Sequence, residues 1–174
     1  YKRQPNITLF KGEDMHPGIN GPKYKDKPAV IMAGSGDIIT HQELNELSNQ
    51  GAQLFRSLGL KPGDSLAFMM ENHKLFFPIA FAAYRSGLKY TAISWRLQAS
   101  EVEYIVKDCG AKVFITSKFL EESAQSLANS LEGVHKYMLD GITDDFKSYE
   151  KEIDKMPVTP CLLYTSDAAD DMQC

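Results

Sequence analysis

Short apolar runs alternate with helix-like segments along most of this chain, and this alternation limits the folds available to it. The clearest example spans residues 71–111, where the end of an apolar run, an apolar helical segment, a second run, an arginine-bearing turn and an amphipathic segment follow one another. Strands that alternate with helices build a parallel sheet, because each helix carries the chain back across the sheet. The pattern therefore predicts an α/β fold, with a mostly parallel sheet and flanking helices.

A hairpin and a capped helix are expected before this region. Two β-prone runs, residues 29–33 and 38–40, flank a Gly-Ser-Gly-Asp turn, which is typical of a hairpin. A phosphate loop is the alternative, but a dinucleotide fingerprint needs a third glycine and a helix directly after the loop. Thr40 and Glu43 have the spacing of a capping box and predict that a helix begins there. Gly59 is placed to end it.

The remaining periodicity predicts four further strands and three further helices. Strands are expected over residues 65–70, 90–94, 112–116 and 134–139, and the first two of these are expected to be buried. Asn72 is expected to cap an all-round apolar helix that ends at Gly87. Helices are also expected from Gln98 or Ser100 to Cys109, and over residues 119–131. Residues 146–153 are expected to form a looser segment.

Charge and hydropathy exclude some classes of protein. The net charge is −4, and Lys and Arg are scattered singly, so no basic stripe is available for nucleic acid. No apolar span approaches the roughly 20 residues that cross a bilayer, and no signal-peptide core is present. These features predict a cytoplasmic protein.

Both ends of the chain differ from its centre. Residues 1–14 lack a hydrophobic period and are expected to be a disordered arm or an untranslated leader, with translation beginning at Met15. Residues 161–170 match the translation of an adapter sequence used in preparing DNA libraries, so residues 161–174 are expected to be an artefact; a natural tail is the alternative. One domain is therefore expected, over residues 15–160.

A search for catalytic groups gives few candidates. The four histidines, at positions 16, 41, 73 and 135, have no metal-ligand spacing, and His73 is expected to be a surface residue rather than a base. Cys109, Cys161 and Cys174 form no CxxC pair, and Cys109 is expected to be a small buried side chain. The carboxylate pairs 121–122 and 144–145 are expected to face solvent. No catalytic or metal-binding residue is assigned.

Three stretches carry a family resemblance: GDIITHQELNELSNQGAQLFRSLGLKPGDSLAFMMENH, FAAYRSGLKYTAISWRL and EVEYIVKDCGAKVFITS. With them, residues 15–160 resemble the beginning of the large N-terminal domain of an acyl-CoA synthetase of the adenylate-forming superfamily, and most closely the fatty-acid-type CoA ligases. The resemblance implies ATP, Mg²⁺, CoA and a carboxylate, such as a fatty acid, as ligands of the whole enzyme. The carboxylate would react with ATP to give an acyl-adenylate, and the CoA thiol would then displace AMP.

The resemblance also implies that this stretch is inactive alone and binds none of these ligands well. The glycine- and threonine-rich phosphate loop, the ribose-binding aspartate and the adenylating lysine of the family would lie after Pro160. Leu162 to Ser166 are similar to the lead-in to that loop, but Asp167 stands where the loop needs glycine, so no nucleotide role is assigned there.

One residue is carried over from the family. Arg96, in the turn Ser94-Trp95-Arg96-Leu97, matches an arginine that lies near the CoA phosphates in some ligases, although Asn is frequent where this chain has Ser94. A guanidinium group suits phosphate because it donates two parallel hydrogen bonds. The alternative is that Arg96 packs over Trp95 or pairs with Glu101 or Glu103. Two functional alternatives also stay open: a non-catalytic α/β binding module, and an adenylating enzyme with a different acceptor, as in luciferase or peptide synthetases.

Overall fold

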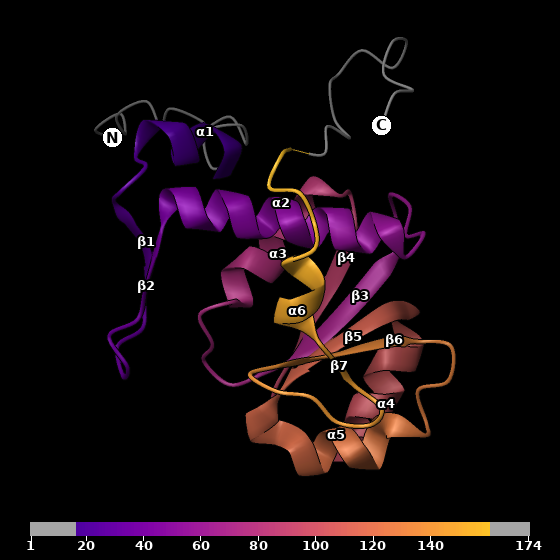
Figure 1. Cartoon of the computed structure of the whole chain (residues 1–174). Coiled ribbons are helices and arrows are strands. Elements are labelled where there is room, and N and C mark those ends of the chain that lie inside the picture. Colours follow the sequence, from indigo (N-terminus) through magenta and orange to yellow (C-terminus); the bar gives the residue numbers. More distant parts are fainter. Residues whose placement is uncertain (1–16, 161–174) are drawn as a thin grey trace, which may run out of the picture.

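Five parallel strands form the centre of the molecule (Figure 1). The structure is a computed structural model, and it describes residues 17–160. The strands lie in the order β4 (Lys89–Ile93), β3 (Ser65–Met69), β5 (Ala111–Ser117), β6 (His135–Leu139) and β7 (Lys147–Ser148). The predicted α/β fold with a parallel sheet is confirmed. The predictions for residues 1–14 and 161–174, and for His16, Cys161 and Cys174, lie outside the described residues.

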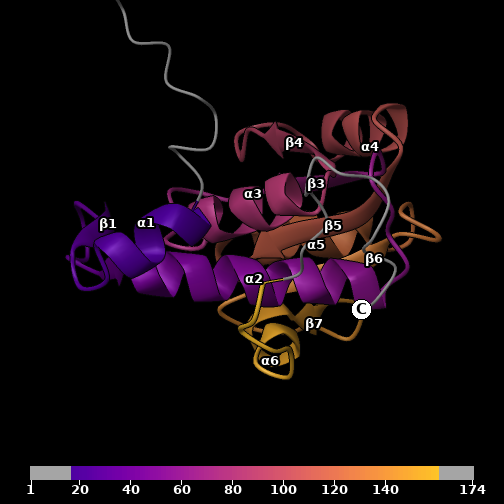
Figure 2. The same ribbon diagram turned by 90° about the horizontal axis from the view of Figure 1, so that it is seen from above.

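Helices cover both faces of this sheet (Figures 1 and 2). On one face lie α2 (His41–Ser57), α3 (Phe76–Arg85) and α6 (Tyr149–Ile153), and on the other lie α4 (Ala99–Asp108) and α5 (Glu121–Ala128). Successive residues of β3 explain the two layers, since Leu66 and Phe68 join the first core cluster and Ala67 and Met69 join the second. A strand buried on both faces needs a continuous apolar run, as residues 65–70 provide.

The N-terminal elements agree with the sequence pattern and add one helix to it. Helix α1 (Pro17–Lys23) packs on α2, and β1 (Pro28–Ile31) pairs antiparallel with β2 (Ile38–Thr40). In the capping box, Thr40 Oγ1 accepts from the Glu43 amide at 3.2 Å, and Glu43 Oε2 accepts from the Thr40 amide at 2.8 Å. The hairpin and the start of α2 are therefore confirmed.

The start of α3 differs from the prediction. Asn72 does not cap the helix, which begins at Phe76 after a residue that makes no side-chain capping bond. Instead, His73 and Leu75 form a turn in which the Leu75 amide donates to His73 Nδ1 at 3.1 Å. Pro78 is compatible with this start, because it lies in the first helical turn, where its missing N–H has no helical partner.

Strand β4 is largely exposed, with only Ile93 at its end buried, although most of the predicted strand is apolar. It lies at the edge of the sheet, and Tyr90 is 47% exposed. The apolar run predicted a buried strand. This prediction fails because a local pattern does not show how many strands lie beside β4 in the sheet.

The C-terminal part differs from the prediction in two ways. First, the helix expected over residues 119–131 is shorter, because the single turn η2 (Lys118–Leu120) precedes α5. Second, the segment expected to be loose contains β7 and α6, and Phe146, Tyr149 and Ile153 are buried there. No helix within residues 17–160 has the length and apolar character to cross a membrane.

Candidate functional site

Polar side chains gather where the central strands end. Glu71 follows β3, Ser117 ends β5 and Asp140 follows β6. The chain passes from β3 to β4 on one side and later returns to β5 on the other side, so connections diverge between β3 and β5. Ligands of open parallel sheets bind at such a point, outside the carboxyl ends of the strands. We call the carboxyl ends of β3, β5 and β6, with Glu71, His73, Ser117 and Asp140, the polar edge.

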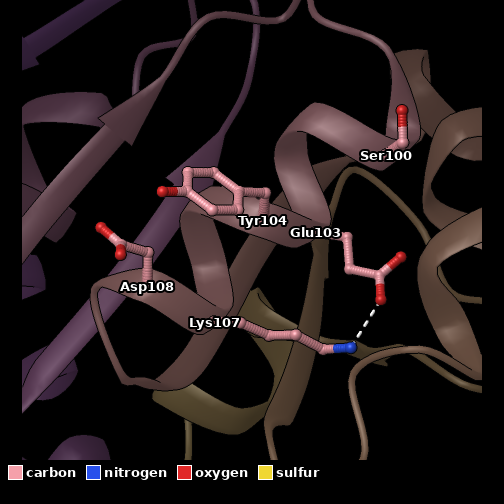
Figure 3. Close-up of a pocket in the computed structure, with 5 residues that line it drawn as sticks. All are labelled: Ser100, Glu103, Tyr104, Lys107 and Asp108. Atoms are coloured by element: carbon pink, nitrogen blue, oxygen red, sulfur yellow. Dashed lines mark hydrogen bonds and ion pairs between the residues drawn. The ribbon is translucent and has the colours of Figure 1, made fainter.

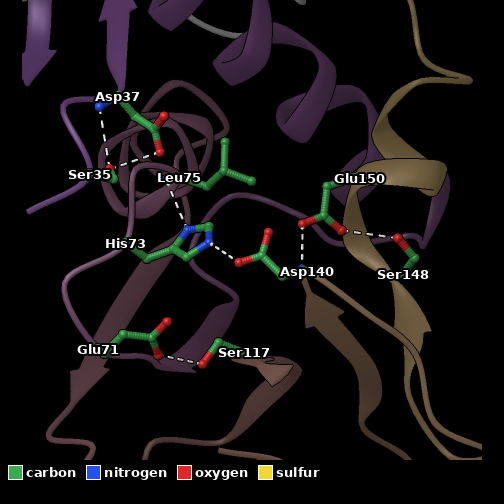
Figure 4. Close-up of polar contacts among 9 residues, drawn as sticks. All are labelled: Ser35, Asp37, Glu71, His73, Leu75, Ser117, Asp140, Ser148 and Glu150. Atoms are coloured by element: carbon green, nitrogen blue, oxygen red, sulfur yellow. Dashed lines mark hydrogen bonds and ion pairs between the residues drawn. The ribbon is translucent and has the colours of Figure 1, made fainter. Parts of the chain in front are cut away.

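Glu71 and Ser117 are in direct contact at this divergence. The Ser117 hydroxyl donates to Glu71 Oε2 at 2.5 Å (Figure 4). Ser117 is fully buried, so its hydroxyl needs an acceptor, and the half-buried Glu71 provides one. The contact joins the loops that leave β3 and β5.

His73 is buried and lies beside Asp140, so the predicted surface position is wrong. Its exposed fraction is 8%, and its Nε2 lies 3.0 Å from Asp140 Oδ2 (Figure 4). Because Nδ1 accepts from the Leu75 amide, the proton of the neutral ring is on Nε2, which donates to Asp140. Both ring nitrogens are therefore occupied. With neither ring nitrogen free, this geometry suits a cross-link better than a general base.

Asp140 is also hydrogen-bonded to Glu150, which lies on α6. Asp140 has a left-handed backbone, with φ +58°, and its amide donates to Glu150 Oε1 at 2.8 Å. The other oxygen of Glu150 accepts from the Ser148 hydroxyl at 3.0 Å. The loop after β3 is thus fastened through Asp140 to the start of α6. Glu71, Ser117 and Asp140 were not predicted as site residues; the available signal was that each one ends or closely follows a predicted strand.

Arg96 lies at the carboxyl end of β4, in the exposed turn before α4. Its guanidinium carbon is 5.2 Å from the centre of the Trp95 ring, and that ring meets Phe119 edge to face at 6.0 Å between centroids. Glu101 instead accepts from the Gln98 amide at 2.9 Å, and Glu103 pairs with Lys107. Stacking on Trp95 is thus present, and the side chain of Arg96 still faces solvent. Its contact with CoA phosphate stays a prediction.

A shallow, open hollow lies on the outer face of α4 (Figure 3). Its rim includes Tyr104 and the ion pair between Lys107 Nζ and Glu103 Oε1, 2.5 Å apart. The hydrogen bond from Lys107 lowers the pKa of Glu103. Small-molecule sites bury most of their ligand, and an open helix surface does not, so we assign no ligand to this hollow.

The other residues considered in the sequence have ordinary surroundings. Cys109 is half-buried, and the His41 ring contacts Tyr24 with the centroids 5.7 Å apart. Asp144, Asp145 and Glu122 are exposed, as predicted, and the half-buried Glu121 pairs with Lys118 at 2.7 Å. Within residues 17–160, no three His, Cys, Asp or Glu side chains are grouped so that they could hold a metal ion.

The sheet order and the polar edge define the chain as an open parallel α/β protein of the kind that binds ligands beyond its strand ends. The chain belongs to the AMP-binding enzyme family, whose sequence model matches residues 20–169. The resemblance to the adenylate-forming enzymes is therefore confirmed.

Known relatives share both sequence and fold with this chain. The fatty acid–[acyl-carrier-protein] ligase ScoC of Streptomyces coeruleorubidus is 28% identical over 148 residues, which are 80% of this chain and 27% of that protein. A feruloyl-CoA synthase of an Amycolatopsis species is 29% identical over 140 residues, covering 79% of this chain and 28% of that protein. The crystal structure of the anthranilate CoA ligase AuaEII superposes with a TM-score of 0.74 at 20% identity, over 82% of this chain and 28% of AuaEII. The matched part of the chain thus covers 27% and 28% of the length of these two relatives.

Proposed function

We propose that the chain is the N-terminal part of an ATP-dependent acid–thiol ligase. In the first step a carboxylate oxygen attacks the α-phosphorus of ATP, which gives an acyl-adenylate and releases pyrophosphate. In the second step the CoA thiol attacks the acyl carbon, so that a thioester forms and AMP and a proton leave. The family match over residues 20–169 carries this proposal. Relatives named as fatty-acid, feruloyl and anthranilate ligases support a small carboxylic acid as substrate, and we favour a fatty acid.

Arg96 is the residue of this chain to which we assign a ligand. An exposed guanidinium at the end of a parallel strand can donate two parallel hydrogen bonds to a CoA phosphate. The contact with Trp95 limits the positions that the long side chain can take. Binding therefore needs less loss of side-chain freedom than it would for an arginine without such a contact.

We expect the 174-residue chain to be inactive alone and to bind ATP, Mg²⁺ and CoA poorly. The resemblance assigns the phosphate loop, the ribose-binding aspartate and the adenylating lysine to residues beyond Pro160. Mg²⁺ would offset the charge of the triphosphate in the whole enzyme. A reaction that uses ATP and CoA is consistent with the cytoplasm.

The test uses the whole protein, expressed from its full-length gene. We expect carboxylate-dependent exchange of labelled pyrophosphate into ATP, and a thioester when CoA is added. Absence of exchange with a broad set of fatty and aromatic acids would favour the alternative of a non-catalytic binding module.

The acceptor is a separate question, because the names of two relatives differ on it, one giving an acyl carrier protein and one CoA. Exchange without a CoA thioester would indicate another acceptor, such as a carrier protein, or a luciferase-like or peptide-synthetase-like reaction. Comparing CoA with a purified carrier protein in the second step separates these outcomes.

A further inference from the structure

Three carboxamide side chains on α2 hold the last described part of the chain. Asn49 Nδ2 donates to the Val158 carbonyl at 2.7 Å, Gln50 Nε2 to the Met156 carbonyl at 3.2 Å, and Gln53 Nε2 to the Thr159 carbonyl at 3.4 Å. The donors and acceptors are more than a hundred residues apart in sequence. We call Asn49, Gln50 and Gln53 the amide clip.

Carboxamides suit this segment because of its prolines. Pro157 and Pro160 have no N–H, and residues 157–160 form no helix or strand. The carbonyl groups of the segment therefore need donors from elsewhere, and Asn and Gln each carry two N–H bonds. The amide clip supplies these N–H donors from one helix. Met156 adds an apolar contact with the core.

Asn49 is the most constrained member of the clip. Its side chain is fully buried, and its Oδ1 has no hydrogen-bond donor among the described residues. Removing the amide would take its donor from the Val158 carbonyl, and because this hydrogen bond is partly buried, we expect a greater cost than for the loss of an exposed one. Gln53 lies nearer to solvent, so its contribution can be tested with little risk to the fold.

We propose that the amide clip is a positioning device that sets the path of the chain as it leaves residues 156–160. This inference rests on the proposed function, in which the whole protein carries its phosphate loop after Pro160. A loop that binds phosphate through its backbone amides needs a fixed anchor, because displacements below 1 Å weaken such contacts. The clip supplies the anchor without contacting ATP, so Asn49, Gln50 and Gln53 act through the segment.

The test compares the double variant Gln50→Ala/Gln53→Ala, and separately Asn49→Ala, with Gln42→Ala in the whole protein. Gln42 is a matched control, because it lies on the same helix and its side-chain Nε2 donates to Glu46 Oε1 at 2.7 Å, within that helix. Two measurements are made: KM values in pyrophosphate exchange, and the rate of tryptic cleavage after the exposed Lys155, next to the held segment.

We expect the double variant to raise KM for ATP about fivefold or more, as for the loss of one or two neutral hydrogen bonds. KM for the carboxylate should change less than twofold, cleavage after Lys155 should be faster, and Gln42→Ala should change neither. Faster cleavage with an unchanged KM for ATP would overturn the positioning role and leave the clip a purely structural contact. If Asn49→Ala does not fold, the double variant Gln50→Ala/Gln53→Ala still tests the positioning role.

Failure of the proposed function gives a different result. The unsubstituted whole protein would then show no exchange at all, and the positioning role would fall with it. Cleavage after Lys155 would still report whether the clip holds the segment.

Discussion

A methyl group added to Gly51 would meet the hydroxyl of Tyr149. An ideal Cβ at this position lies 2.7 Å from Tyr149 Oη and 2.8 Å from the Cβ of Ala82. Helix α2 therefore lies so close to α3 and α6 that only glycine fits at position 51. This close approach joins the first helix that covers the sheet to the last one.

Overpacking of the core by Gly51→Ala should cost about 1–3 kcal/mol of stability. Replacing a mid-helix glycine returns about 0.5–1 kcal/mol, so we expect a net loss of up to about 2 kcal/mol. Thermal melting of the whole protein measures the change. The control is Gly34→Ala, since a Cβ at Gly34 meets no atom within 4 Å. Equal melting temperatures for the two variants would contradict the expectation.

The Tyr149 hydroxyl should make the fold sensitive to alkaline pH. Burial raises the pKa of Tyr149, and its Oη has no hydrogen-bond partner among residues 17–160. Because burial holds the folded-state pKa above the unfolded value of about 10, ionisation of this phenol does not weaken the fold below pH 10. Above pH 10 the unfolded chain loses this proton more readily than the folded one, so stability falls as the pH rises further.

Tyr149→Phe should therefore weaken the loss of stability above pH 10, while at pH 7 it should be neutral or stabilising. Chemical denaturation at pH 7 and pH 10.5 tests this. Comparing the variant with the unsubstituted protein cancels the titration of other groups, such as Tyr137, whose pKa burial also raises. Parallel pH dependences would contradict the prediction.

His73 and Asp140 should contribute unequally to stability. His73→Ala removes a buried ring and the acceptor of the Leu75 amide, so we expect a cost of about 1–3 kcal/mol. Asp140→Ala should cost less than about 1 kcal/mol, because its side chain is 61% exposed and water can replace it. Thermal melting gives both values, with the exposed His135→Ala as control. A larger loss for Asp140→Ala would contradict this account.

Arg96→Ala in the whole protein should raise KM for CoA about tenfold, as for the loss of a charged hydrogen bond. KM for ATP should change less than twofold, and Arg96→Lys should restore part of the binding. Steady-state kinetics of thioester formation gives KM for CoA and KM for ATP in both Arg96 variants. Lys112→Ala is a suitable control, because Lys112 pairs with Asp64 at 2.8 Å, at the amino end of the sheet. Equal rises in both KM values would rule out a specific CoA contact.

The 174-residue chain by itself should aggregate. Phe77, Tyr84 and Tyr90 are 49%, 58% and 47% exposed, and β4 is an edge strand. Ala92→Lys places a charge on that edge and should raise the soluble yield, whereas the same change at Ser100, on the surface of α4, should not. Size-exclusion chromatography distinguishes these outcomes. A soluble monomer with a cooperative melt would contradict the prediction.

Local sequence patterns predicted the fold better than they predicted the polar edge. The capping box of Thr40 and Glu43 involves residues three apart, so it could be found by spacing alone. The exposure of β4 depends on strand order, which no local run encodes. His73 and Asp140 are 67 residues apart, and their contact arises only because β3 and β6 end at the same edge. Helix α6 was missed because five residues are too few to show a period.

The amide clip recognises only main-chain carbonyl groups. Side chains such as Val158, which is 47% exposed, take no part in this recognition. Residues 158 and 159 can therefore change in identity without loss of the contact, provided that the backbone keeps its course. An insertion or deletion of one residue there would shift every carbonyl relative to its donor, so this junction should tolerate substitution and resist changes in length.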